Sequence, residues 1–249
     1  MLNSLTTSFV ARLKRNDEAA WFELWETFGP VIRAQLTKWG KGRIGSQTVQ
    51  DLSQETMAAL SDSIDRYDPS RGARFSTWLL AIAKHVLGDE LDRRNAQKRG
   101  SGKKAGVFEE AWMAGSATSV DDQYEAAVFR AKVEAAIRLV EKECDFTDFS
   151  IYRMRVLDGQ PGKDVAAALG ISEPTVSRRL ARVRDSLRVK LREVIATYSF
   201  TQDELEEPER NGLALNPTKA DDELFDESVA EIYHRQTQLR RQQQAAITD

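Results

Sequence analysis

The sequence predicts an all-α protein with two small helical domains, a flexible linker between them and an acidic C-terminal tail. Three observations support this fold class. Apolar residues recur at the helical spacing along most of the 249 residues, without a recognisable strand in the first domain. A stretch rich in Gly, Ser, Lys and Ala interrupts that pattern, and the charge changes sign near the C-terminus. The expected divisions are residues 1–96, 97–122, 123–199 and 200–249.

Composition limits the classes of protein that the chain can be. A hydrophobic fraction of 41% is enough for compact cores at this length. No apolar run is long enough for a membrane span, and the N-terminus lacks the apolar block of a secretory signal, so we expect no membrane insertion. Cys144 is the only cysteine, which excludes an internal disulfide and fits a reducing cytoplasm.

The net charge of −3 conceals an uneven distribution along the chain. Residues 1–199 contain 31 basic and 27 acidic side chains, a balance of +4, whereas residues 200–249 contain 5 and 12, a balance of −7. The acidity therefore belongs to the tail, and the rest of the chain is compatible with a nucleic-acid partner.

Residues 4–39 are predicted to form one or two amphipathic helices. Asn16 or Asp17 is the expected N-cap of the second, and Pro30 is expected to kink or divide it. Three glycines then connect this part to the next helix. The apolar faces, which we assign to the core, contain Phe9, Leu13, Trp21, Leu24, Trp25, Phe28, Val31, Ile32 and Leu36.

The next helix is predicted to have Thr48 as its N-cap, with Asp51 facing its positive end. Its core-facing side is expected to contain Val49, Leu52, Thr56, Leu60 and Ile64. Its opposite side carries Asp51, Gln54, Glu55 and Asp62. The pattern alone leaves two interpretations of this polar side open, a solvated face and a docking surface.

A turn is predicted after this helix, because Asp-Pro and Gly prevent the helix from continuing. Three arginines surround one tyrosine there, an arrangement suited to phosphates and a base; these residues are Arg66, Tyr67, Arg71 and Arg74. A new helix is expected with Ser76 as its N-cap and with Phe75 and Trp78 in the core. Its polar face and far end carry the basic side chains Lys84, His85, Arg93 and Arg94.

Helical periodicity returns at Asp122, and a Gly- and Pro-containing break precedes a compact motif. The motif has the spacing of a helix-turn-helix, with a small residue where the helices cross and a glycine in the turn. Its defining residues are Val165, Ala166, Leu169, Gly170, Ile171 and Val176. Ser172 is the expected cap of the second helix.

The second helix of this motif has one apolar and one basic side. The apolar stripe consists of Val176, Leu180, Val183, Leu187 and Leu191. If that stripe is buried, the outward residues include Thr175, Arg178, Arg179 and Arg182. Residues 178–192 contain seven basic side chains against one acidic, as a helix that enters a DNA major groove requires.

The motifs of the first domain, in this order and spacing, resemble the promoter-melting domain of sigma-70-family initiation factors, in particular the extracytoplasmic-function branch. They are DLSQETM at 51–57, YDP at 67–69 with RG at 71–72, FSTWL at 75–79 and DELDRR at 89–94. The helix-turn-helix is similar to the minus-thirty-five-reading domain of the same family. The resemblance covers residues 5–195.

This resemblance implies an RNA polymerase sigma factor, a non-catalytic subunit that binds core polymerase, recognises minus-ten and minus-thirty-five promoter elements and promotes melting of the DNA. It implies polymerase contacts at Asp51, Gln54 and Glu55. It implies minus-ten contacts, including a flipped base in the turn, at Arg66, Tyr67, Arg71, Arg74, Lys84, His85, Arg93 and Arg94. It implies minus-thirty-five contacts at Thr175, Ser177, Arg178, Arg179 and Arg182. Lys84 and His85 stand where Arg-Asn is frequent, which departs from the family pattern. No cofactor or metal is implied.

Two other classes of protein compete with this interpretation. A stand-alone helix-turn-helix transcriptional regulator would use only the second domain and would not need the acidic helix or the arginine-tyrosine turn. An enzyme is disfavoured, because His85, His234 and Cys144 lack metal-ligand spacing, and neither a phosphate-cradling glycine loop nor a nucleophile motif is present.

The acidic tail has no counterpart in the minimal family. Residues 201–220 are acidic and contain two prolines and a glycine, so disorder is predicted there. Residues 221–245 can form an amphipathic helix. Either the tail is a solvated appendage, or it covers the basic helix 173–192 or binds an anti-sigma factor or another regulator. If it covers that helix, deletion of residues 200–249 should raise promoter affinity.

Overall fold

The structure is a computed structural model that describes residues 4–66, 74–99, 122–213 and 221–248. These residues form helices and connecting turns, with no strand among them. The all-α prediction is therefore confirmed. The described helices include none that is long and apolar enough to cross a membrane. The chain divides into two compact units, Met1–Val128 with Ser199–Thr201, and Phe129–Tyr198 with Gln202–Asp249.

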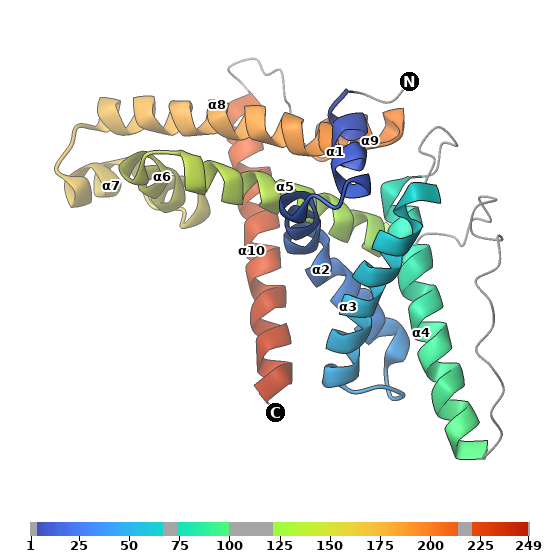
Figure 1. The fold of residues 1–249 in the computed structure, drawn as a ribbon. Coiled ribbons are helices and arrows are strands. Elements are labelled where there is room, and N and C mark those ends of the chain that lie inside the picture. Colours follow the sequence, from blue (N-terminus) through green and yellow to red (C-terminus); the bar gives the residue numbers. More distant parts are fainter. Residues whose placement is uncertain (1–3, 67–73, 100–121, 214–220, 249) are drawn as a thin grey trace. The chain divides into compact units, whose positions relative to one another are not determined.

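The first unit is a helical bundle (Figure 1). Its elements are α1 (Ser4–Lys14), α2 (Glu18–Gly40), α3 (Ser46–Ser63), the 3₁₀ turn η1 (Ile64–Arg66), α4 (Phe75–Arg99) and the first residues of α5 (Asp122–Glu143). Its core is built by apolar side chains that face inward at the helical spacing, as predicted. Leu24, Phe28 and Leu36 of α2, Leu60 of α3 and Leu79 of α4 are among those with at most traces of exposure.

Helix α2 begins where the sequence indicates. The Asp17 carboxylate accepts a hydrogen bond from the Ala20 N–H at 3.0 Å, which satisfies one of the unpaired donors of the first turn. Pro30 lies inside α2 and does not divide it. An interior proline costs about 3 kcal/mol of helix stability. Burial of Phe28, Val31 and Ile32 around it offsets that cost.

Two predicted helix starts are wrong, for a common reason. Helix α3 begins at Ser46 after Gly45, so Thr48 is not its N-cap, and the Thr48 hydroxyl accepts a hydrogen bond from Arg94 instead. Helix α4 begins at Phe75, and the buried Ser76 hydroxyl donates to Glu125 of α5 at 2.8 Å. In both cases a partner from a distant helix uses the hydroxyl that local capping would have used.

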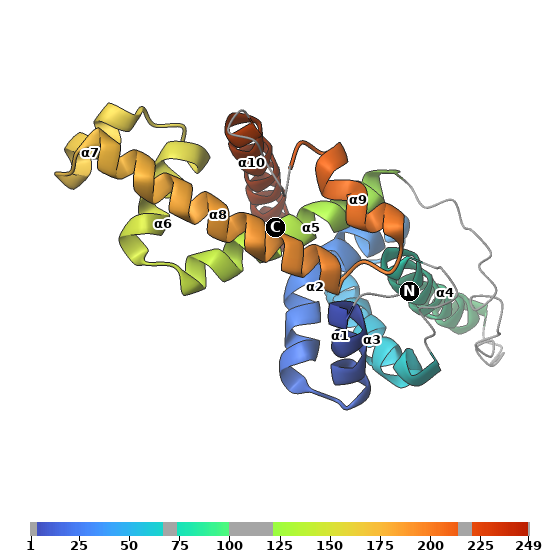
Figure 2. The same cartoon turned by 90° about the horizontal axis from the view of Figure 1, so that it is seen from above.

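The second unit contains the rest of α5, α6 (Phe146–Tyr152), the π-helical segment η4 (Arg153–Leu157), α7 (Gly162–Leu169), α8 (Glu173–Thr197), α9 (Gln202–Arg210) and α10 (Asp221–Thr248). Figure 2 shows α6 and α7 beside the N-terminal half of the long helix α8. The cluster that joins them is Ile151, Val165, Ala166 and Val176, with Met154, Leu169, Ile171 and Leu180 packed against it.

The helix-turn-helix prediction is confirmed in its details. Gly170 follows α7 with φ +64° and ψ +32°, a left-handed conformation that glycine adopts at little cost. The Ile171 N–H then bonds the Ala166 carbonyl at 3.0 Å, which closes the end of α7. Ser172 is the N-cap residue of α8, although its side chain contacts the Thr175 hydroxyl at 2.9 Å and not a backbone N–H.

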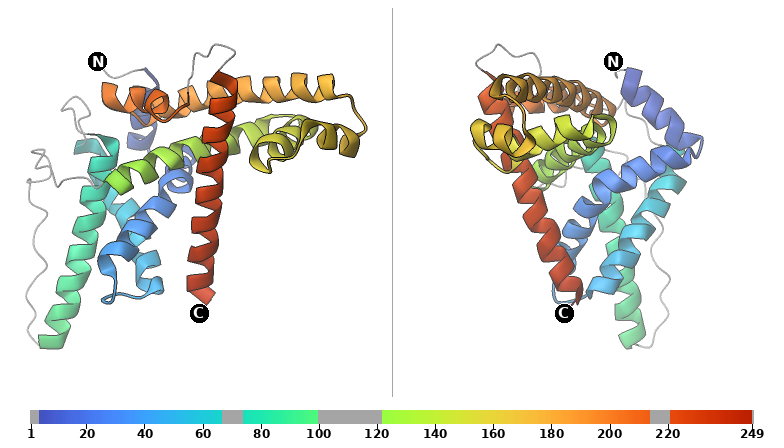
Figure 3. Two further views of the ribbon diagram at one scale, coloured as in Figure 1. Left: turned by 180° about the vertical axis from the view of Figure 1, so that it is seen from behind. Right: turned by 90° about the vertical axis from the view of Figure 1, so that its left-hand side faces the viewer.

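The C-terminal residues depart from the prediction of disorder. Helix α9 covers Gln202–Arg210 and tolerates Pro208 near its end, where the remaining helix is short. Helix α10 was predicted over 221–245 and extends from Asp221 to Thr248. Its N-terminal end meets α8 and η4 (Figure 3), where Phe225 and Val229 are fully buried. The expectation of disorder for residues 214–220 lies outside the described residues.

Candidate polymerase and nucleic-acid interfaces

The outward side of α3 carries the predicted polymerase-binding residues. Asp51, Gln54 and Glu55 are all exposed, whereas Leu52 and Thr56 on the other side of the helix are buried. Asp51 accepts a hydrogen bond from the Gln47 side chain at 3.1 Å, within the same face. The three side chains therefore share one acidic, solvent-facing surface that the described residues of the first unit do not use for packing.

The middle of α4 presents Lys84 and His85 outward. Lys84 is exposed, and His85 is partly exposed with its Nε2 at 3.1 Å from an Asp89 carboxylate oxygen, one turn further along the helix. Lys84 offers an ammonium group with three donors. His85 is directed along the helix surface by Asp89, so a DNA contact by His85 would have to compete with that carboxylate.

Arg93 and Arg94, at the far end of α4, share one buried carboxylate. The Nε of Arg93 donates to Glu90 at 2.7 Å and the Nε of Arg94 donates to it at 2.6 Å, while Glu90 is 8% exposed. Burial alone would raise the pKa of Glu90, but the hydrogen bonds from Arg94 and Arg93 outweigh it and hold that pKa below its ordinary value. Glu90 is therefore ionised at neutral pH.

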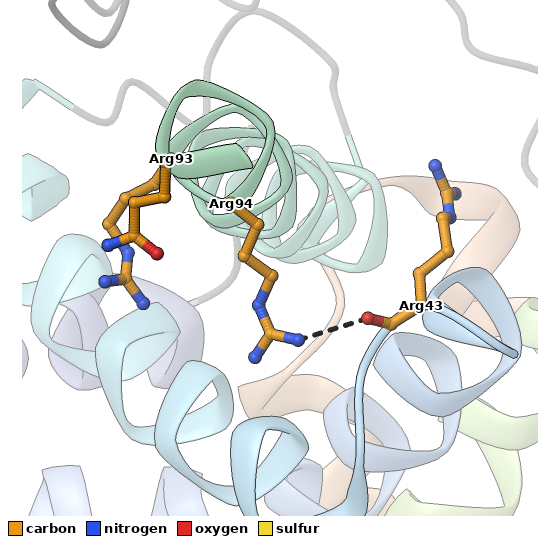
Figure 4. A pocket seen from close by; sticks show the side chains of 4 residues that line it. Arg43, Arg93 and Arg94 are labelled. Carbon is orange, nitrogen blue, oxygen red and sulfur yellow. Dashed lines mark hydrogen bonds between the residues drawn. The ribbon is translucent and has the colours of Figure 1, made fainter. Parts of the chain in front are cut away.

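Arg94 also reaches beyond α4. Its Nη2 donates to the Thr48 hydroxyl at 2.8 Å. Its Nη1 donates to the main-chain carbonyl of Arg43 at 3.1 Å, and Figure 4 shows this second bond. Three acceptors on three segments of the chain thus hold one guanidinium. Arg93 is 62% exposed at its side chain, whereas Arg94 is 33% exposed. Of these two predicted DNA contacts, Arg93 is the more accessible to a ligand, whereas Arg94 connects α4 to α3 and to the α2–α3 loop.

The arginine-tyrosine turn is described only at its edges. Tyr67, Arg71 and the side chain of Arg66 lie outside the described residues. Arg74 is partly buried, and its Nη1 lies 3.1 Å from a carboxylate oxygen of Glu125 in α5. The structure therefore engages Arg74 in an ion pair inside the first unit.

The recognition helix α8 brings together most of its predicted contact residues. At about 100° per residue, Thr175, Arg179 and Arg182 lie within about 100° of Arg178 around the helix axis. These four residues share one sector about 100° wide, whereas the exposed Ser177 lies about 100° from Arg178 in the opposite direction, outside that sector. Arg178 is exposed, and its Nε donates to the Pro174 carbonyl one turn earlier at 3.3 Å.

A buried acid that could not be identified from the sequence orders two of these arginines. The Asp148 carboxylate, in α6, accepts hydrogen bonds from Nη1 of Arg179 and Nη1 of Arg182, each at 2.9 Å. The Asp148 side chain is 4% exposed, while that of Arg182 is 70% exposed. Each guanidinium keeps other N–H groups that can face a ligand. The only sequence signal was an acidic residue next to the apolar Phe149 on an amphipathic helix.

The opposite side of α8 carries a second pair of arginines, which α10 covers. Arg184 and Arg188 lie about 240° and 280° around the axis from Arg178. Arg184 donates to Asp226 at 3.0 and 2.6 Å and to Asp222 at 2.8 Å. Arg188 donates to Asp222 at 2.8 Å and lies over the Phe225 ring, with 4.6 Å between the guanidinium carbon and the ring centroid.

Two further contacts tie the C-terminal helices into the second unit. The Tyr152 hydroxyl donates to Asp226 at 3.4 Å, and burial together with that carboxylate keeps the pKa of Tyr152 well above its ordinary value. The Nζ of Lys132 in α5 lies 3.9 Å from Glu204 and 4.0 Å from Glu207, and the Lys132 and Glu204 side chains are each 1% exposed. A buried lysine requires such carboxylates nearby.

Comparison with known proteins identifies a family match in each of the two parts of the chain that carry these residues. Residues 24–97 match the family described as Sigma-70 region 2, and residues 147–187 match the family described as Sigma-70, region 4. The chain is similar to the ECF RNA polymerase sigma factor RpoE of Cereibacter sphaeroides, with 28% identity over 187 residues, which cover 73% of this chain and 94% of the relative. It is also similar to a probable RNA polymerase sigma-C factor of Mycobacterium bovis, with 29% identity over 140 residues, 56% of this chain and 68% of that protein.

Proposed function

Since the chain belongs to the extracytoplasmic-function branch of the sigma-70 family and is an RNA polymerase sigma factor, we propose which of its surfaces meet polymerase and which meet the promoter. In this proposal it acts in the cytoplasm as a non-catalytic subunit. The observation that carries the assignment is the separation of charge: α3 presents an acidic face, whereas α4 and α8 present basic faces.

Core polymerase is assigned to Asp51, Gln54 and Glu55. These side chains are exposed on one side of α3, and no described helix of the first unit packs against them. Two carboxylates and an amide can accept and donate hydrogen bonds across a polar protein interface. Charge complementarity of this kind contributes to specificity and to the rate of association.

The minus-ten element is assigned to α4 and to the turn before it. Lys84 and Arg93 are the best placed of the described residues, because both are exposed. Arg66, Tyr67 and Arg71 remain candidates for the capture of a flipped base, which costs a few kcal/mol of stacking that a fitted pocket can return. His85 and Arg74 would first have to exchange their present carboxylate partners, and Arg94 would act through the position of its neighbours.

The minus-thirty-five element is assigned to Thr175, Arg178, Arg179 and Arg182 of α8. Arginine forks read guanine edges in the major groove and also bind phosphates. Asp148 supports this assignment, because it holds two of the forks in place before DNA arrives, which lowers the entropy lost on binding. Ser177 is a weaker candidate, since its side of the helix differs.

The C-terminal helices are assigned a structural role in the second unit. Their acidic residues neutralise Arg184 and Arg188, which lie on the side of α8 away from the proposed DNA-reading residues. Among the described residues, the C-terminal helices therefore do not cover the proposed DNA-reading side of α8. An anti-sigma factor or another regulator would bind through other residues of 200–249.

The test of the function is assembly followed by transcription. The purified chain is mixed with bacterial core polymerase and applied to gel filtration, and the complex is then assayed on a library of promoters. Co-elution together with promoter-dependent transcripts is expected. A chain that binds DNA alone and never joins polymerase would instead be a stand-alone regulator.

A further inference from the structure

We propose that Arg43, Arg93 and Gln97 form a binding site for the phosphate backbone of promoter DNA, in the pocket between the α2–α3 loop and the end of α4. The proposal rests on the assignment of α4 to the minus-ten element and extends it to the α2–α3 loop. These three residues and Arg94 line one open pocket in the first unit (Figure 4).

Arg94 builds this pocket by fixing its two walls. Its guanidinium bonds Glu90 within α4, the Thr48 hydroxyl on α3 and the main-chain carbonyl of Arg43 in the loop. The loop cannot move away from α4 without losing these bonds. Any residue at position 43 offers the same carbonyl. The hydrogen bond from Arg94 therefore fixes the position of residue 43 and leaves its side chain available to bind a ligand.

Arg43 is the residue that this tie places. Figure 4 shows the Arg43 side chain directed away from the Arg94 guanidinium, on the other side of Arg94 from Arg93. The Arg43 side chain is exposed, and its Nη2 donates a hydrogen bond to the Trp39 carbonyl at 3.1 Å. A guanidinium has five N–H donors, so donors remain that can point into the pocket.

The charge of the pocket selects an anion. Three guanidinium groups line the pocket, and Glu90 is the carboxylate bonded to two of them, so these four groups together carry a formal charge of +2. Glu90 is already shared by Arg93 and Arg94 and is buried, so it does not compete for Arg43. Guanidinium forks and the Gln97 amide donate to phosphate oxygens in the geometry that phosphate prefers.

The open shape and the position on α4 favour a DNA backbone over a small anion. A polymer passing along the end of α4 would contact Arg93 and Arg43 in succession, on either side of Arg94. Such contacts fix the register of the protein on DNA and carry no sequence preference themselves. An acidic segment of polymerase is also negatively charged and could bind the same pocket, and the experiment distinguishes it from DNA.

The experiment compares Arg43→Ala with Lys41→Ala, which removes the same charge from the same loop without touching the pocket lining. Binding of polymerase holoenzyme to minus-ten fork DNA is measured across a range of salt concentrations. Arg43→Ala should make the plot of log affinity against log salt shallower by about 0.7 to 0.9, the value for one lost phosphate contact. Lys41→Ala should leave the slope near that of the wild type, and unchanged thermal melting should show that Arg43→Ala folds.

A second measurement locates the phosphate. Single neutral methylphosphonates are placed along the fork DNA, and one position should weaken binding of the wild type but not of Arg43→Ala. An equal loss at every position, an unchanged salt slope, or weaker assembly of Arg43→Ala with polymerase in the absence of DNA would overturn the proposal. If the wild type does not join polymerase, the proposed function fails, and the same two measurements on the chain alone still decide the pocket.

Discussion

Arg184 and Asp226 form a two-point ion pair that joins helix α8 to helix α10. Nε of Arg184 donates to one carboxylate oxygen at 3.0 Å and Nη2 donates to the other at 2.6 Å, and the side chains are 10% and 15% exposed. Two-point pairs of this kind fix orientation as well as distance. The pair lies on the side of α8 away from Arg178, so it positions the helix without blocking its proposed DNA-reading side.

Replacement of one partner of this pair should destabilise the second unit strongly. Asp226→Ala leaves Arg184 buried with only Asp222 to accept its donors, and loss of one partner of a buried pair costs about 3 to 5 kcal/mol. Urea unfolding monitored by circular dichroism measures the change. Glu223→Ala, an exposed acid in the same turn, is the matched control and should change stability by less than about 0.5 kcal/mol. Equal effects of the two variants would show that the pair contributes nothing specific.

Termination of the chain after Thr201 should weaken binding to the minus-thirty-five element. The deletion removes the carboxylates that accompany Arg184, Arg188 and Lys132 and uncovers the surface that Phe225 buries. Ser199–Thr201 remain, because they belong to the first unit. Affinity is measured for holoenzyme on promoters with an intact and with a scrambled upstream element.

The expected result is a loss of affinity on the intact promoter alone, together with a lower melting temperature. This direction is opposite to the gain of affinity that would follow if the tail covered helix 173–192, which was one of the alternatives that the sequence left open. A gain of affinity on the intact promoter would restore that earlier interpretation and would make the C-terminal helices inhibitory.

Much of the fold is predictable from local pattern. The stripe from Val176 to Leu191 and the glycine at position 170 are enough to specify the helix-turn-helix, because periodicity and turn chemistry act over a few residues. The two wrong helix starts involve Thr48 and Ser76, whose hydroxyls have partners 46 and 49 residues away. Separations of that length are invisible to local rules.

The site was less predictable than the fold for the same reason. The basic and acidic faces of α3, α4 and α8 can be listed from the sequence, but the use of each side chain cannot. Arg93 and Arg94 are adjacent and chemically identical, yet only Arg94 reaches Thr48 and the loop carbonyl. Helix α9 was missed because a buried lysine from α5, 72 residues before Glu204, stabilises its acidic first turn.

Neutralisation of Asp148 should raise affinity for DNA of unrelated sequence and lower discrimination. Asp148→Asn removes the buried charge that Arg179 and Arg182 share, so both forks become freer to contact phosphates of any sequence. Binding is compared on specific and scrambled minus-thirty-five DNA at several salt concentrations. The ratio of the two affinities should fall, and the salt dependence on scrambled DNA should steepen. Asp145→Asn, at the helix cap three residues earlier, tests whether loss of helix stability alone gives this result.

Stability of the first unit should depend on the ionisation of Glu90. The pKa of Glu90 is lowered in the folded protein, so its contribution is fully present above the unfolded value of about 4.3 and is lost as pH falls through the folded value. The melting temperature of the wild type should therefore decrease as the pH is lowered through this acidic range. The melting temperature of Glu90→Gln should be lower at neutral pH and should decrease less on acidification. Parallel curves of melting temperature against pH for the two proteins would show that ionisation of Glu90 does not contribute to stability.

Charge reversal on the outward side of α3 should prevent assembly with polymerase while leaving the fold intact. Asp51→Lys with Glu55→Lys replaces two exposed acids, so no core contact is lost and circular dichroism should be unchanged. Like charge across an interface costs several kcal/mol, which is enough to abolish a complex of ordinary affinity. Co-elution with core polymerase measures assembly, and Glu18→Lys with Glu26→Lys, at two exposed acids on α2, controls for the same change in net charge. Normal assembly by the double variant would show that this face is a solvated surface and not a docking site. Failure of the control to assemble would instead indicate an effect of overall charge.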